Sequence, residues 1–350
     1  MNETSEMQES RIIKIFVVSA MFVMTLGPSS CYGRSGPGER FPFKYQNWSA
    51  IEIAPNEEYA AAYIGKDRIL LENWVSLFSV SGEVIDSDSC GKGAPADIVW
   101  DTSSSFFLVI NEGEQACLYQ VTERELKKVR ELAYPEGISM DAGAFYNGAF
   151  YLFGAKESHG LFDSVHRVFY RFDLIGDGGP YLKQWVNIES GGRVKLVFHG
   201  HGDGSADQFF IWQLNCIEEW SFSEGERRQR ACNNSGPSEF PVEDVVTAWA
   251  TDVWGIDMDD SVFVWDWSNA VPEEKFKFEY PFVQFSAHRS GLYFLLGSRE
   301  GEPGTVRHYS RQGDLIRTVQ LPWKNVFCMD LSENKIAVLS NTGEVFVAGL

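Results

Sequence analysis

The chain has 350 residues, of which 44% are hydrophobic, 23% are charged and 14% are aromatic. A chain of this length and composition buries a large core, either as one domain or as two smaller ones. Its 49 acidic and 30 basic residues give a formal net charge of −19. This charge argues against a general nucleic-acid binder, because contacts to phosphate need clustered lysine and arginine side chains. We therefore expect no nucleic-acid partner.

The first 30 residues have the pattern of a signal peptide. Arg11 and Lys14 precede an apolar run over residues 15–26, and small residues follow that run. A basic start, a short apolar segment and a small-residue exit direct a chain to export, and the run is short for a transmembrane helix. We expect residues 1–30 to be the signal peptide and residues 31–40 to be a turn-rich linker.

The sequence around Cys31 resembles the lipobox of bacterial lipoproteins, because Ser29 and Ser30 precede this cysteine at the end of the apolar run. Pro28 stands where the lipobox has leucine, which is a departure from the pattern. Three outcomes stay open, namely a lipid anchor at Cys31, ordinary cleavage nearby, or an uncleaved anchor. Each places the body of the protein outside the cytoplasm, in the periplasm or on the outer surface.

The body of the chain, residues 41–350, consists of short apolar runs that are separated by glycine, proline, asparagine and serine. The runs form seven groups, which cover residues 50–86, 97–134, 143–188, 194–231, 245–280, 282–321 and 326–348. Equivalent runs recur at roughly forty residues, which is the repeat length of four-stranded propeller blades. We predict an all-β chain with a single β-propeller of seven blades. Six blades is the alternative, because the fifth group is hard to register.

The sequence does not decide the structure of two of the seven groups, the second and the seventh. The last run of the second group can be a strand or a short helix, because Thr122 and Glu125 form a capping-box pattern and three apolar residues follow at a spacing of three. The seventh group has only three runs. Residues 41–46 could supply the missing outer strand and close the ring, which would remove an exposed sheet edge.

Five cysteines lie in the body. Cys216 and Cys232 stand at mirror positions about a hairpin turn at residues 223–226, so a disulfide across the two strands is geometrically plausible. Cys90 and Cys117 are a second candidate pair, and Cys328 is expected to be a buried thiol in an apolar run. No pair has the Cys-x-x-Cys spacing of a zinc site.

Residues 91–99 resemble the Gly-x-Gly-x-Pro-x-Asp entry of NHL-type propeller repeats, and residues 77–84 look like the outer hairpin of that family. The resemblance implies a propeller with exported bacterial relatives. It implies no activity, because propellers of this kind include scaffolds, ligand binders and enzymes.

Two sets of residues could bind a metal. His199, His201 and Asp203 form a His-x-His-x-Asp pattern that could hold calcium or zinc, and the alternative is a glycine-rich hairpin loop. The aspartates near the inner-strand runs could converge on the central channel, as in propeller lactonases; the alternative is a role in turns. These aspartates are Asp97, Asp101, Asp141 and Asp330.

The function that this pattern favours is binding of a protein or a glycan at the cell envelope by a monomeric propeller. The rival is a metal-dependent, lactonase-like hydrolase at the mouth of the channel, for which no catalytic residue can be assigned. No Gly-x-Ser-x-Gly elbow and no P-loop occurs in the sequence. Tryptophans such as Trp254 and Trp265 could line a glycan-binding groove or pack between blades. We expect no cofactor other than calcium or zinc.

Overall fold

The computed structural model describes residues 34–36, 39–40, 49–65, 73–91, 95–111, 115–123, 125–156, 165–174, 183–190, 194–198, 207–213, 216–232, 245–249, 252–256, 261–266, 271–280, 282–297 and 303–350. The predicted signal peptide, Cys31 and the proposed closing strand at 41–46 lie outside these ranges. The described residues form strands and turns. No helix among them is long and apolar enough to cross a membrane.

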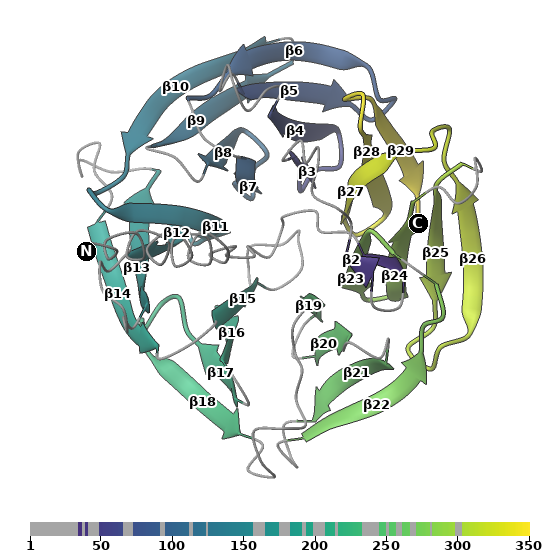
Figure 1. Cartoon of the computed structure of the whole chain (residues 1–350). Helices are drawn as coiled ribbons and strands as arrows, with labels where there is room; N and C mark the ends of the chain where they lie inside the picture. Colours follow the sequence, from purple (N-terminus) through teal and green to yellow (C-terminus); the bar gives the residue numbers. More distant parts are fainter. Residues whose placement is uncertain are drawn as a thin grey trace, which may run out of the picture.

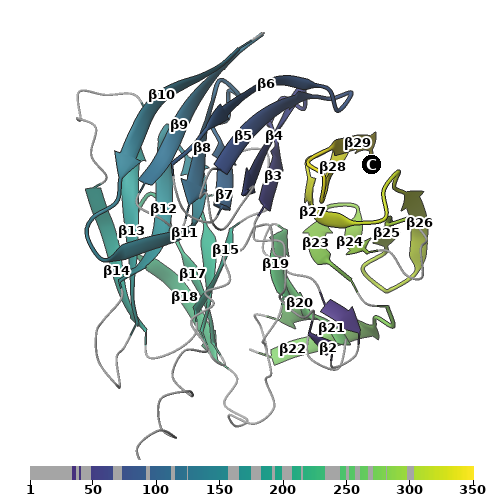
Figure 2. The ribbon, with the colours of Figure 1, turned by 45° about the horizontal axis from the view of Figure 1, so that its top comes forward.

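Seven antiparallel sheets stand side by side around a central axis and form a ring (Figures 1 and 2). Blade I contains β3 (Ser49–Ile53), β4 (Tyr59–Gly65), β5 (Asn73–Ser79) and β6 (Val84–Ser89). Blade II contains β7 (Pro95–Trp100), β8 (Phe106–Asn111), β9 (Gln115–Thr122) and β10 (Glu125–Ala133). Blade III contains β11 (Ile138–Tyr146), β12 (Ala149–Lys156), β13 (Val165–Asp173) and β14 (Lys183–Ser190).

The remaining blades follow in chain order around the ring. Blade IV contains β15 (Val194–Phe198), β16 (Phe209–Gln213), β17 (Cys216–Trp220) and β18 (Arg227–Cys232). Blade V contains β19 (Val245–Trp249), β20 (Asp252–Ile256), β21 (Ser261–Asp266) and β22 (Val271–Lys277). Blade VI contains β23 (Gln284–His288), β24 (Gly291–Leu296), β25 (Thr305–Tyr309) and β26 (Leu315–Gln320). Blade VII contains β27 (Val326–Leu331), β28 (Lys335–Ser340) and β29 (Val345–Gly349).

The seven-bladed prediction is confirmed, and the six-bladed alternative is wrong. In each blade the strands pair in sequence order, with the first strand nearest the axis and the last strand on the outside (Figure 1). Six sheets have four strands, and the sheet of blade VII has three among the described residues. A separate two-stranded ladder joins β1 (Arg34–Gly36) to β2 (Glu39–Arg40).

The helical alternative for the end of blade II is wrong, because this segment is β10. It pairs with β9 from Glu125 to Ala133. Thr122 and Glu125 close the hairpin between these strands, and the Thr122 hydroxyl donates to the Glu125 carbonyl at 3.4 Å. Pairing with the apolar strand β9 therefore outweighs the local preference for a helix, which is a weak determinant by itself.

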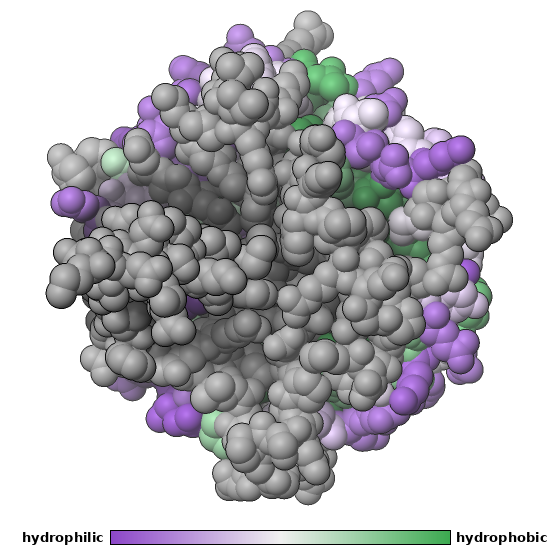
Figure 3. All heavy atoms as spheres, in the orientation of Figure 1, coloured by the Kyte–Doolittle hydropathy of each residue, from purple (hydrophilic) through white to green (hydrophobic). Residues whose placement is uncertain are grey.

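The core lies between the blades, where each sheet packs against its two neighbours. Central strands have both faces covered and are apolar almost throughout, as in β24, whose residues are all buried. Outer strands have a solvent face and are polar, as in β26, where five of the six residues are exposed. Figure 3 shows hydrophilic side chains along the outer margin of the ring. This difference explains why runs within one blade vary in hydrophobicity.

The structure contains two disulfides, which agrees with the disulfide expectation. Cys216 and Cys232 are directly paired residues of β17 and β18 and are bonded. Cys90 and Cys117 are also bonded, so the segment that leaves blade I is tied to the third strand of blade II. Cys328 is buried in β27 and belongs to neither disulfide.

Candidate functional site

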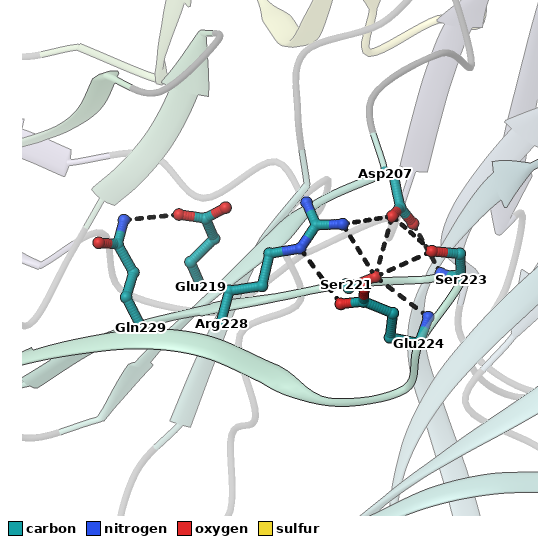
Figure 4. Close-up of polar contacts among 7 residues, drawn as sticks. All are labelled: Asp207, Glu219, Ser221, Ser223, Glu224, Arg228 and Gln229. Atoms are coloured by element: carbon teal, nitrogen blue, oxygen red, sulfur yellow. Dashed lines mark hydrogen bonds and ion pairs between the residues drawn. The ribbon is translucent and has the colours of Figure 1, made fainter.

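The predicted metal ligands His199, His201 and Asp203 lie outside the described residues. Asp207, four residues after Asp203, is described and contacts other residues of blade IV (Figure 4). One carboxylate oxygen accepts hydrogen bonds from the hydroxyls of Ser221 and Ser223, at 2.9 and 2.6 Å, and from Arg228 Nη2 at 2.5 Å. The other oxygen accepts the Ser223 backbone N–H at 2.6 Å. Asp207 therefore ties the start of the segment that leads into β16 to the β17–β18 turn.

This environment sets the charge state of Asp207. Partial burial raises the pKa of the carboxyl, but the hydrogen bonds from Ser223 and Ser221 and the charge of Arg228 outweigh it, so that the pKa lies below 3.8. Arg228 also pairs with Glu224 at 3.5 Å. The charged and hydroxyl groups of this cluster bind one another, and we assign the cluster a structural role in blade IV.

Two of the predicted channel aspartates connect neighbouring blades. Asp97 Oδ2 accepts the backbone N–H of Gly143 in blade III at 2.9 Å, and Asp330 Oδ2 accepts the N–H of Ile53 in blade I at 2.7 Å. A Cβ at position 143 would lie 2.5 Å from Ile110 Cδ1, so this approach of strands favours glycine. Asp97, the aspartate of the NHL-like entry, thus joins two inner strands.

Asp101 has a different role. Asp101 caps its own hairpin, where its carboxylate accepts the N–H groups of Ser105 and Phe106 and the hydroxyl of Ser103. The side chain of Asp141 lies outside the described part. Among the described residues no group of three or more histidine, cysteine or acidic side chains is placed to hold a metal ion. The expected convergence on a channel metal is thus not seen for Asp97, Asp101 and Asp330.

A third link of this kind was missed in the sequence. Gln284 Oε1 in blade VI accepts the N–H of Met329 in blade VII at 2.7 Å. The signal available was position, because Gln284 and Asp97 both lie in the first strand of a blade, β23 and β7 respectively. A neutral amide oxygen accepts an N–H as a carboxylate does, so a search limited to acidic residues overlooked it.

The most ordered polar feature is a row of turns that we call the hairpin rim. It consists of the turns between the first and second strands of blades VI, VII, I and II, at residues 289–290, 332–334, 54–58 and 101–105. These turns meet at one end of the inner strands and are joined by hydrogen bonds. Four consecutive blades thereby present one connected polar surface.

Glu57 joins blade I to blade VII at the hairpin rim. Glu57 Oε1 accepts the hydroxyl of Ser332 and the backbone N–H of Asn334, both at 2.7 Å. Lys335 Nζ donates to the Glu57 carbonyl at 2.5 Å. Blade VI reaches the same turn from the other side, where Arg289 forms an ion pair with Glu333 and donates to the Asn334 side-chain oxygen at 3.4 Å.

Ser104 makes the corresponding link between blades II and I, where its hydroxyl accepts the Asn56 N–H at 2.9 Å. Glu57 and Ser104 occupy the same position in turns of identical hydrogen bonding, and both have positive φ, at 58° and 57°. Residues other than glycine rarely adopt this conformation. Here the strained position carries a side chain that bonds the preceding blade, which glycine could not do.

Ionisable groups at the hairpin rim have shifted pKa values. Burial raises the pKa of Glu57, but hydrogen bonds from Ser332 and Asn334 and the charge of Lys335 outweigh it and hold this pKa below 4.5. His288 is buried at the end of β23. Burial, followed by the charges of Arg289 and His308, lowers its pKa to about 4. At neutral pH Glu57 at the rim is therefore ionised, and His288 at the adjoining end of β23 is neutral.

The described tryptophans differ in exposure, and Trp74, Trp220 and Trp323 are partly exposed. Trp100, Trp254 and Trp265 are at most 4% exposed, which supports packing between blades for these residues. The side chains of Trp185, Trp212, Trp249 and Trp267 are outside the described part.

No family model and no curated protein matches this chain. Among solved structures, a crystal structure of the Cps50 (Swd1) β-propeller domain of Myceliophteria thermophila aligns with a TM-score of 0.56. The alignment covers 86% of this chain and 96% of that one, at 11% sequence identity. A likeness at this identity concerns the fold alone. Together with the seven observed sheets, it identifies the chain as a seven-bladed β-propeller.

Proposed function

We propose that this chain is an exported propeller that binds a protein partner at the cell envelope, with the hairpin rim as its contact surface. The observation that carries the proposal is the set of hydrogen bonds that joins turns of four consecutive blades. Propellers commonly serve as interaction scaffolds, and function on such folds resides in the loops. A surface that is already ordered loses less conformational entropy on binding.

The composition of the rim suits a polar, reversible contact. Asn56, Thr102, Ser103, Glu333 and Asn334 are exposed there, and all of them can donate or accept hydrogen bonds. We favour a protein over a glycan because the turns of the hairpin rim contain no aromatic side chain on which a sugar ring could stack. The absence of a metal cluster from the described residues leaves the hydrolase without support in that part of the chain.

Export is part of the proposal. The two disulfides fit an oxidising compartment, and the lipobox-like sequence predicts anchoring at Cys31. If Cys31 is the anchor, mass spectrometry of membrane fractions will find a diacylglycerol-modified amino terminus there, and Cys31→Ala will release the protein. The NHL-like entry at residues 91–99 supports a relationship to exported bacterial propellers.

A pair of exposed substitutions tests the contact surface. Thr102→Arg alters the rim, and Asn341→Arg places the same side chain in the β28–β29 turn, at the other end of its blade. Envelope proteins cross-linked to the wild type are identified, and the affinity of a purified candidate is then measured for all three forms. We expect Thr102→Arg to weaken binding at least tenfold and Asn341→Arg to leave it unchanged. Equal affinities for the three forms would show that the contact lies elsewhere on the protein. If the protein binds glycans on an array and no envelope protein is captured, the ligand is a glycan and the proposed protein partner is wrong.

A further inference from the structure

The turn of blade VII at residues 332–334 is held from two sides. Glu57 of blade I binds the Ser332 hydroxyl and the Asn334 N–H. On the other side, Arg289 of blade VI contacts Glu333 and Asn334, and His288 lies near the Ser332 backbone. Three residues thus connect the last blade both to the first blade and to the blade before it.

The contact with Glu57 depends on its ionised form. An ionised carboxylate only accepts hydrogen bonds, and it can satisfy a hydroxyl and an N–H at the same oxygen. Such charge-assisted bonds are stronger than neutral ones. A proton on Glu57 removes the charge that these donors and Lys335 face, so protonation weakens the contact on the side of blade I.

Burial beneath the same turn keeps His288 neutral, although the Ser332 backbone favours the protonated ring. Its Nδ1 accepts the Ser290 N–H at 3.3 Å and lies 2.7 Å from the Ser290 hydroxyl. A proton on Nδ1 would face the Ser290 N–H directly. The ring also lies near Tyr293, whose centroid is 6.0 Å away, and the charges that act on it are those of Arg289, His308 and Glu333. Arg289 and His308 oppose a positive charge on His288, whereas Glu333 and the Ser332 backbone favour it.

Both groups titrate in acid, and the sign of the effect is the same. The folded pKa of Glu57 is lowered, so its contribution is present above the usual glutamate pKa of about 4.3 and is lost as pH falls through the folded value. The folded pKa of His288 is about 4, against about 6.5 when exposed. Opening that exposes His288 is therefore favoured progressively as pH falls from 6.5 toward 4.

The packing beneath the turn does not depend on these charges. Blade VII meets blade I through apolar side chains, among them Ile51, Ala337, Leu339 and Val345. The buried N–H of Met329 is bonded to the neutral amide of Gln284. The turn can accordingly open while the sheets stay packed.

We propose that the turn at residues 332–334 is an acid-released latch, which is closed at neutral pH by Glu57 and His288 and opens locally on acidification. Opening uncouples the first hairpins of blades VI, VII and I and changes the shape of the hairpin rim. The latch is a property of the ring and does not rest on the proposed binding partner.

Amide hydrogen exchange tests the proposal on the whole domain without any ligand. Protection factors, corrected for the intrinsic pH dependence of exchange, are measured at pH 7, 5.5 and 3.5 for two amides. We expect the protection of the Asn334 N–H to fall at least tenfold over this range while that of the core amide of Met329 is retained. Constant protection of Asn334 would overturn the latch, and so would a parallel loss at Met329, which reports general unfolding.

Two variants separate the latch from general acid effects. Glu57→Gln removes the ionisable group, and we expect low protection of Asn334 already at pH 7 with less than half of the wild-type pH response. Glu58→Gln alters the exposed neighbour and should behave as the wild type does. Equal pH responses in wild type and Glu57→Gln would remove Glu57 from the mechanism. If Glu57→Gln does not fold, the comparison of Asn334 with Met329 in the wild type still decides the matter.

Discussion

The carboxylate of Asp330 accepts the backbone N–H of Ile53 at 2.7 Å, across a sequence separation of 277 residues. The bond joins the inner strands of the last and first blades and is buried. It resembles the links from Asp97 to Gly143 and from Gln284 to Met329. A side-chain acceptor on one inner strand thus satisfies an N–H of the next inner strand at three junctions.

Removal of this acceptor should destabilise the ring. Asp330→Ala leaves the Ile53 N–H buried without its partner, and we expect a loss of about 1–3 kcal/mol in the free energy of unfolding. Asp330→Asn retains an oxygen at this place and should lose less. Urea denaturation measures both, and Glu83→Ala, at an exposed turn, serves as a control with an effect within about 0.5 kcal/mol. A loss in Asp330→Ala no larger than that of the control would contradict a stabilising role.

A pair of glycine substitutions tests the contact between the outer hairpin of blade I and blade VII. Gly82 has φ of 82°, and a Cβ there would lie 2.4 Å from the Val345 carbonyl oxygen. Gly148 has φ of 77° with nothing within 4 Å of its Cβ position. We expect Gly148→Ala to cost about 1 kcal/mol through backbone strain alone and Gly82→Ala to cost about 1–3 kcal/mol more through the clash. Equal melting temperatures for the two variants would show that the hairpin moves away without cost.

The disulfide between Cys90 and Cys117 should stabilise the junction of blades I and II. It closes a loop with a sequence separation of 27, which corresponds to about 3 kcal/mol from the unfolded state. The double variant Cys90→Ala, Cys117→Ala should therefore unfold at lower denaturant concentration. Because both cysteines are fully buried, the native protein should also resist a thiol reductant until it unfolds. Rapid reduction in the absence of denaturant would argue against this burial.

The Asp207 cluster predicts a contribution to stability that depends on pH. Because the folded pKa is lowered, the contribution is present above the unfolded pKa of about 3.9 and is lost as pH falls through the folded value. Asp207→Asn should be less stable than the wild type at pH 7, and the difference should shrink below pH 4. Glu224→Gln, at a 59% exposed partner of Arg228, should change little. A difference between Asp207→Asn and wild type that stays constant down to pH 2 would contradict the assigned charge state.

Closure of the ring by residues 41–46 stays a prediction. Blade VII has three described strands, with β29 at the outer side of its sheet. If these residues complete the sheet, their deletion should lower the melting temperature by several degrees. Deletion of residues 31–36, which has the same length, should have a much smaller effect. An unchanged melting temperature after the first deletion would refute this closure.

Much of the fold could be predicted from local patterns. Blade I shows this well, because the predicted group at residues 50–86 corresponds to β3–β6, which begin at Ser49 and end at Ser89. Cys216 and Cys232 could be paired by their distances from one turn. The helical alternative for β10 also came from a local signal, namely the capping pattern. It was wrong because pairing with β9 outweighs that signal.

The sequence by itself determined which segments become strands, how they group into blades and which surfaces are polar, because these depend on neighbours a few residues away. Only the tertiary structure decided the roles of Asp97, Asp330, Gln284 and Glu57. Each bonds a residue of another blade, and the position of that partner is set by closure of the ring. A carboxylate that faces a backbone N–H 277 residues away has no local signature, since the hydrogen bond exists only after the first and last blades have met.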